Sequence, residues 1–189
     1  MTRNRPVLFG LLGALALLAG AAGEARPSDL TEDEVKAAFL FSFSKFVTWP
    51  AEAFPEKDSS LEIGVVGHDE FAEILEATVK GKSVGGRAVR VVRFADARRA
   101  RACPILYFSG DLKVSGSARE WTGQRGILTI GEQEGFASRE GIIGFFLEKS
   151  RVRFEVNTAA AERAGLKISS QVLGLARLVG DAPTEGGDR

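Results

Sequence analysis

Two neighbouring side chains offer the only arrangement in this chain that resembles a catalytic pair. The carboxylate of Asp69 could orient the imidazole of His68 for general-base catalysis. Ser109 or Ser115 could then serve as the nucleophile, but neither serine stands in the Gly-x-Ser-x-Gly sequence of a nucleophile elbow. A lone histidine in a loop is usually a hydrogen-bonding residue. We therefore expect no catalytic residues and no enzymatic activity.

Two glycine-containing segments imitate nucleotide-binding loops. Gly81-Lys82-Ser83 ends like a phosphate-binding loop, but the glycine required five positions before Gly81 is replaced by Glu76. The segment Gly64-Val65-Val66-Gly67 lacks the glycine spacing of a dinucleotide fingerprint. Both segments are typical of ordinary turns and strand ends, and we expect no bound cofactor.

The sequence contains few residues that could bind a metal ion or form a disulfide. His68 is the only histidine and Cys103 the only cysteine, which excludes multi-histidine sites and an internal disulfide. The carboxylates of Glu132, Glu134, Glu148 and Glu155 are scattered over turns and a strand, where they are expected to be solvated. Cys103 precedes Pro104 at the start of an apolar segment, so it is expected to be a buried structural thiol. The sequence predicts no metal site.

The first residues predict export. Arg3 and Arg5 precede an apolar run from Val7 to Leu18, which is followed by small residues. This pattern is typical of a cleaved signal peptide, and the run is shorter than the about 20 residues that span a bilayer. We expect a signal peptide over 1–22, a flexible segment over 23–30, one domain over 31–180 and a disordered tail over 181–189. The expected location is the periplasm.

The elements that would hold any site alternate along the chain. Thr31 and Glu34 have the spacing of a capping box that opens a helix. Strands are predicted over 61–66, 89–94, 105–108 and 127–130, and a second helix after residue 69. Phe145 to Leu147 and Val152 to Val156 form a predicted hairpin. Asn157 caps a further helix, and the spacing of apolar residues from Ile168 to Val179 predicts a last, amphipathic helix.

This order of elements predicts the fold class. Alternating strands and helices indicate a single three-layer, Rossmann-like α/β domain, with a mostly parallel sheet, an antiparallel edge hairpin and flanking helices. The chain contains 25 acidic and 25 basic residues, so no pull toward nucleic acid is expected.

Four apolar residues are candidates for binding a partner. The first helix is predicted to bury a stripe of side chains: Val35, Ala38, Phe39, Ser42, Phe43 and Phe46. Leu40 and Phe41 lie off this stripe, and Leu173 and Leu178 flank the stripe of the last helix. Grouped apolar side chains at a surface indicate an association site, either with a partner or in a homodimer. The alternative is that these helices are buried on more than one side.

Several motifs, in order, resemble those of the YfiR-like family. They are the segments 36–41, 45–50, 103–107, 127–132, 135–137 and, most specifically, Val152 to Ser170. The resemblance implies an exported protein that binds the periplasmic domain of an inner-membrane diguanylate cyclase, or another sensor protein, and represses it. It further implies a protein linked to the outer membrane that relieves repression, which would affect biofilm formation.

One departure from the family concerns redox control, because this chain lacks the disulfides of the best-known members and has only Cys103. Two other functions stay open. A periplasmic small-ligand sensor would use the crevice at the carboxyl ends of the parallel strands. A hydrolase would use His68 and Asp69.

Overall fold

The computed structural model describes residues 30–67, 69–110 and 115–181. Outside these ranges lie the predicted signal peptide, the segment 23–29, His68 and the tail residues 182–189. For Asp69 and Ser115, only the backbone is described. No helix among the described residues is long and apolar enough to cross a membrane.

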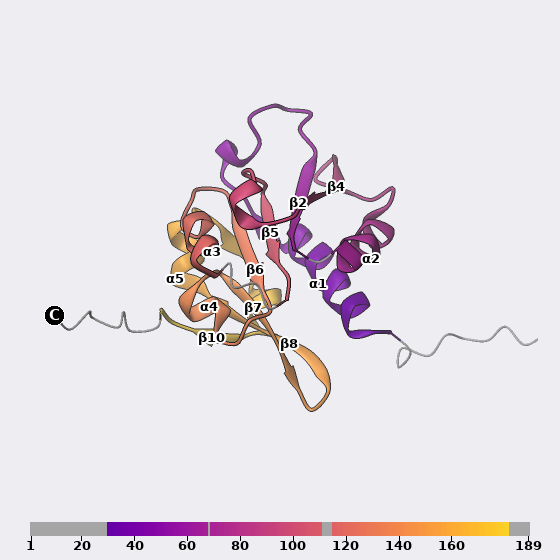
Figure 1. Ribbon diagram of the computed structural model, residues 1–189. Helices are drawn as coiled ribbons and strands as arrows, with labels where there is room; N and C mark the ends of the chain where they lie inside the picture. Colours follow the sequence, from indigo (N-terminus) through magenta and orange to yellow (C-terminus); the bar gives the residue numbers. More distant parts are fainter. Residues whose placement is uncertain (1–29, 68, 111–114, 182–189) are drawn as a thin grey trace, which may run out of the picture.

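The core of the molecule is one eight-stranded sheet in the order β10-β8-β7-β6-β5-β2-β4-β3 (Figure 1). Its strands are β2 (Leu61–Val66), β3 (Ser83–Val84), β4 (Arg87–Phe94), β5 (Ile105–Phe108), β6 (Leu128–Gly131), β7 (Ile143–Glu148), β8 (Arg151–Asn157) and β10 (Arg177–Val179). Strands β4, β2, β5, β6 and β7 are parallel, β8 is antiparallel to β7, and β10 runs parallel to β8. Strands β1 (Val47–Thr48) and β9 (Lys167–Ile168) form a separate antiparallel pair.

Helices cover both faces of the sheet, as Figure 1 shows. The helical elements are α1 (Glu32–Phe46), η2 (Ala51–Ala53), α2 (Asp69–Val79), η3 (Ala97–Arg99), α3 (Ser115–Trp121), α4 (Phe136–Arg139), α5 (Thr158–Arg163) and α6 (Ser170–Leu173). One apolar core joins the sheet to α1, α2 and α5, and a second joins its other face to η3, α3 and α4. The predicted three-layer, Rossmann-like α/β fold is thus confirmed.

Several local predictions are confirmed in detail. Thr31 and Glu34 form the capping box of α1, and the Asn157 side chain accepts a hydrogen bond from the N–H of Ala160 at the start of α5. The hairpin joins β7 to β8 through Lys149 and Ser150, which both have positive φ angles, as a two-residue type I′ turn requires. It projects beyond the neighbouring strands (Figure 1).

The buried face of α1 is rotated about the helix axis relative to the predicted one, so part of the predicted stripe was wrong. Ala38 is exposed, whereas Leu40 is fully buried and lies with Ala37 and Phe43 in the core. The helix packs against both α2 and β8, so apolar side chains on more than one side are covered. Lys36 also lies on the buried face of α1. The pattern of apolar residues could not predict this, because lysine is not part of that pattern.

The predicted amphipathic helix over 168–179 was also wrong. This segment contains the end of β9, the single turn of α6 and then β10. Strand pairing explains the difference, because β10 aligns Arg177 with Glu155 and Leu178 with Val156 of β8. The Arg177 guanidinium also donates to the Glu155 carboxylate at 2.7 Å, which fixes this register. The predicted hairpin is therefore not the edge of the sheet, since β10 lies outside it.

Candidate functional site

The four predicted partner-binding residues do not form one surface. Leu40 is fully buried, so its assignment to the surface was wrong. Leu173 is partly buried and packs against the core from α6. Phe41 also packs partly against the core, and the ammonium groups of Lys45 and Lys82 lie 4.8 and 4.6 Å from its ring centroid. Only Leu178 is largely exposed.

Leu178 belongs to the edge strand of the sheet. No other strand among the described residues pairs with the outer side of β10, and Leu178 and Leu175 are 58 % and 71 % exposed. We call these two leucines, together with the outer backbone of β10, the edge surface. Exposed edge strands with apolar side chains are available to pair with another chain.

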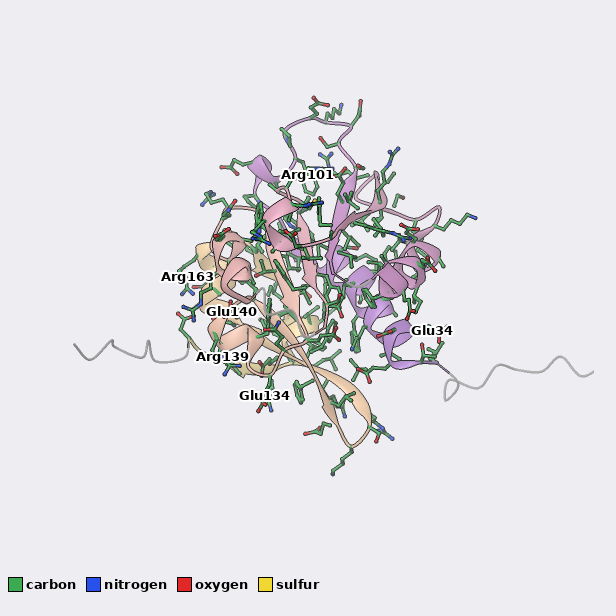
Figure 2. The ribbon with its side chains drawn as sticks, viewed as in Figure 1. Glu34, Arg101, Glu134, Arg139, Glu140 and Arg163 are labelled. Atoms are coloured by element: carbon green, nitrogen blue, oxygen red, sulfur yellow. The ribbon has the colours of Figure 1, made fainter. Side chains whose placement is uncertain are left out.

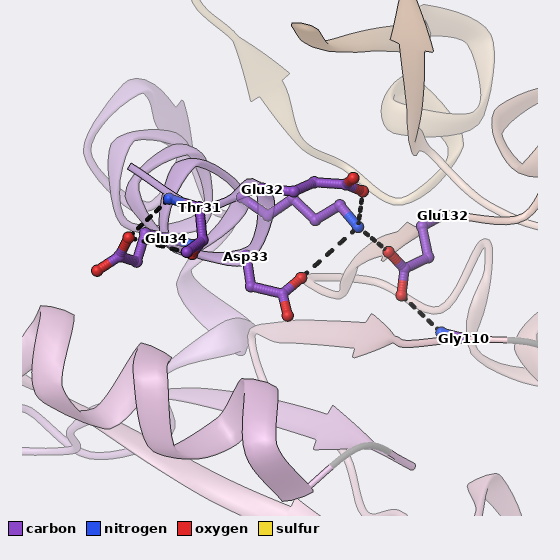
Figure 3. Close-up of polar contacts among 7 residues, drawn as sticks. Thr31, Glu32, Asp33, Glu34, Gly110 and Glu132 are labelled. Carbon is purple, nitrogen blue, oxygen red and sulfur yellow. Dashed lines mark hydrogen bonds and ion pairs between the residues drawn. The ribbon is translucent and has the colours of Figure 1, made fainter. Parts of the chain in front are cut away.

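A charged cluster lies at the carboxyl end of β6 (Figure 3). The Lys36 ammonium, on α1, forms ion pairs with Glu132, with Glu32 at 2.6 Å and with Asp33 at 3.8 Å. The other carboxylate oxygen of Glu132 accepts a hydrogen bond from the N–H of Gly110 at 2.6 Å. Burial alone would lower the pKa of Lys36, but its bonds to Glu132 and Glu32 outweigh this effect and raise the pKa. The cluster ties α1 to the ends of β5 and β6.

Tyr107, on β5, lies next to this cluster. Its side chain is fully buried, and its hydroxyl has no hydrogen-bond partner among the described residues. Burial, followed by the charges of Glu132 and Asp33, raises the pKa of Tyr107 well above its ordinary value. The hydroxyl lies next to the Glu132 carboxylate, whose interaction with it also contributes to the raised pKa.

An open cavity of about 310 Å³ adjoins the cluster. It occupies the notch where β6 ends, because β7 pairs with β6 only as far as Gly144 and then continues to Glu148. The cavity is lined by Glu32, Lys36, Glu132, Glu134, Gly135, Phe145, Phe146, Leu147, Glu155 and Arg177. We call this cavity the β6 notch.

The walls of the β6 notch are held in place by several contacts. The Arg139 guanidinium donates to the backbone carbonyl of Glu134, and Figure 2 shows both residues at the outer margin of the molecule. On the opposite wall, the Arg177 guanidinium lies 4.0 Å from the ring centroid of Phe146 and pairs with Glu155, which is only 5 % exposed. The expectation that Glu132 and Glu155 are solvated was therefore wrong. The Glu32–Lys36 spacing was the one local sign of this site.

Of the residues first considered for chemistry, the structure describes the side chains of Cys103 and Ser109, whereas His68 and the side chains of Asp69 and Ser115 lie outside the described part of the chain. Cys103 is buried, as predicted, and burial raises the pKa of its thiol to about 11. Ser109 is also buried, and its hydroxyl donates to the backbone carbonyl of Val66. Among the described residues, no group of three or more His, Cys, Asp and Glu side chains could hold a metal ion.

A comparison with family models decides the identity of the chain. The model of the YfiR/HmsC-like family matches residues 33–177. The chain belongs to this family. YfiR-like proteins are periplasmic regulators in cyclic-di-GMP signalling, and the family is not a catalytic one. The matched region runs from the first turn of α1 to the first residue of β10.

The fold is also similar to a solved structure. A conserved domain protein from Vibrio cholerae O1 biovar El Tor strain N16961 superposes with a TM-score of 0.50 and 14 % sequence identity. The match covers 79 % of this chain and 60 % of the Vibrio chain. At this identity the similarity concerns the fold alone. None of the curated proteins compared with the chain matches it.

Proposed function

We propose that this protein is a non-enzymatic periplasmic regulator that binds the periplasmic domain of an inner-membrane diguanylate cyclase and represses it. Family membership supports this proposal, because YfiR-like proteins regulate cyclic-di-GMP signalling. A predicted signal peptide over residues 1–22 supports export. Such a regulator acts by binding and not by catalysis. It represses the cyclase only to the extent that it binds the inactive state of the cyclase more tightly than the active state.

The edge surface is the part of the structure that best fits a partner. Leu178 lies in register with the buried Val156, so it points to the same face of the sheet but stays exposed beyond the last strand. A strand of the cyclase domain that is added to β10 would bury Leu178 and satisfy the free backbone groups of this edge. We choose the edge surface as the proposed interface on the basis of this exposed, unpaired strand.

The binding test compares two variants that place a carboxylate on an exposed strand position. Leu178→Glu should weaken binding to the periplasmic domain of the cyclase at least about tenfold, because a charge would be desolvated against the partner. Ala88→Glu, at an exposed position of β4 near the opposite edge of the sheet, is the matched control and should bind like the unaltered protein. Equal binding by both variants would exclude β10 as the interface.

The cellular test concerns repression itself. Deleting the gene should raise cyclic-di-GMP and biofilm formation, and expression of the full chain should restore the low level. Expression without residues 1–22 should not restore it, since the product would stay in the cytoplasm. Unchanged cyclic-di-GMP after deletion, in a strain in which a cyclase gene adjoins this one, would refute the regulatory function.

A further inference from the structure

We propose that the outer edge of β4 pairs with the same strand of a second copy of this chain, around a two-fold axis at Val92. This homodimer does not depend on whether the protein represses a cyclase. Three observations support it: an open strand edge, a groove of balanced charge beside that edge, and a register in which the two copies are complementary.

The first observation is the open edge of β4, at the side of the sheet away from β10 (Figure 1). Strand β3 covers only the beginning of this edge, because β3 pairs with Arg87 and Ala88. The N–H of Val89 then donates to the backbone carbonyl of Lys82. Among the described residues, no strand pairs with the outer side of residues 90–94. Such an edge is available for the addition of another strand.

The second observation is the groove between this edge and α2. It is an open cavity of about 590 Å³, and its charged lining residues are Glu73, Glu76, Lys80 and Arg90. The two negative and two positive charges balance, so a strongly acidic or strongly basic peptide would meet groups of its own sign there. A second copy brings the same balanced surface, and two-fold pairing places positive groups of one copy near negative groups of the other. Charge complementarity therefore favours a second copy over a charged peptide.

The third observation is the register that the two strands can adopt. Residues opposite each other in an antiparallel pair point to the same face, so a two-fold axis in a continuous sheet passes a residue that lies opposite its own copy. An axis at Val91 would place Phe94 of one copy opposite Ala88 of the other, where β3 already pairs. An axis at Arg93 would place two guanidinium groups opposite each other, which is unfavourable. An axis at Val92 avoids both conflicts.

With the axis at Val92, the neighbours across the interface are complementary. The two Val92 side chains meet, and Arg90 of each copy lies opposite Phe94 of the other, on the face away from α2. A guanidinium group near an aromatic ring is favourable. On the α2 face, Arg93 of each copy lies opposite Val91 and enters the charged groove of the other copy. The two sheets become one continuous sheet, and the β10 strand of each copy stays accessible at its ends.

Charged variants at the axis test the proposal, with the protein obtained from the full chain. Analytical ultracentrifugation over a concentration series should show a reversible dimer. Val92→Lys and Val92→Glu should each raise the dissociation constant of the dimer at least about tenfold, because two like charges would meet at the axis. An equimolar mixture of the two variants should regain the dimer, since unlike charges then meet. Ala159→Lys, at an exposed position of α5, is the control and should dimerise like the unaltered protein.

Disulfide cross-linking shows which edge of the sheet forms the interface. In the Cys103→Ala background, Val92→Cys should form a covalent dimer on mild oxidation, because residues opposite each other in antiparallel strands have Cα atoms about 4.5–5.5 Å apart, which a disulfide can span. Leu178→Cys in the same background tests pairing through β10 instead. Three results would overturn the proposal: a protein that stays monomeric throughout the concentration series, a mixture of the charged variants that stays monomeric, or faster cross-linking through Leu178→Cys than through Val92→Cys.

Discussion

Replacement of Lys36 by methionine tests the ionic link between α1 and the end of β6. Methionine keeps much of the length of the lysine side chain but removes the only cation among the described residues that contacts Glu32, Asp33 and Glu132. The three carboxylates would then repel one another in a partly buried site. We expect the free energy of unfolding to fall without a change of fold.

The size of this loss follows from the exposure of the four side chains. Removing one member of a buried ion pair typically costs about 3–5 kcal/mol. The side chain of Lys36 is 8 % exposed and that of Glu132 20 %, but Asp33 and Glu32 are 39 % and 45 % exposed. Solvent therefore screens part of the repulsion, and we expect a loss of about 2–3 kcal/mol. For a chain of this size, the melting temperature should fall by about 4–12 °C.

The pH dependence gives this prediction its signature. Because the pKa of Lys36 is raised, its contribution to stability is complete below the ordinary value of 10.5 and is lost as the pH rises through the shifted value. The difference in stability between the variant and the unaltered protein should thus become smaller as the pH rises through the shifted pKa of Lys36.

Denaturant unfolding, followed by circular dichroism at several pH values, measures these differences. Lys45→Met, at an exposed position of the same helix, is the matched control and should cost less than about 1 kcal/mol through its lost contact with Phe41. The double variant Lys36→Met with Glu132→Gln should recover part of the loss. A loss below about 0.5 kcal/mol, or one that is independent of pH, would refute the reasoning.

Three further variants test other parts of the structure. Cys103→Ala should cost about 1 kcal/mol through lost packing and leave repression intact, and a thiol reagent should label native Cys103 slowly because its pKa is about 11. Glu140→Gln should weaken the fall in stability as the pH rises above about 4.5, because burial raises the pKa of this carboxyl group and its ionisation disfavours the fold; an unchanged pH profile would contradict this. Gly141→Ala should cost about 1–3 kcal/mol in thermal unfolding, because the added methyl group would overlap the Phe136 ring, and a neutral effect would mean that the ring can move.

The sequence alone determined the features that depend on neighbouring residues. A capping box, an Asn cap and a hairpin each depend on a few neighbouring positions, so Thr31, Asn157 and the hairpin around residues 148–151 could be placed from local patterns. The buried strands β5 and β6 were equally visible as short apolar runs. Together with the order of the elements, these features determined the fold class, and the motifs carried the family resemblance.

Only the tertiary structure decided the features that depend on distant residues. The segment after Ile168 has a helical spacing of apolar residues, but pairing with β8 makes its last part a strand, because tertiary pairing can outweigh a local preference. The face of α1 that is buried depends on where α2 and β8 lie. Lys36 and Glu132 are 96 residues apart, and the β6 notch exists because β6 ends before β7 does. These features cannot be predicted from a local pattern, because each depends on how separate segments pack in the folded chain.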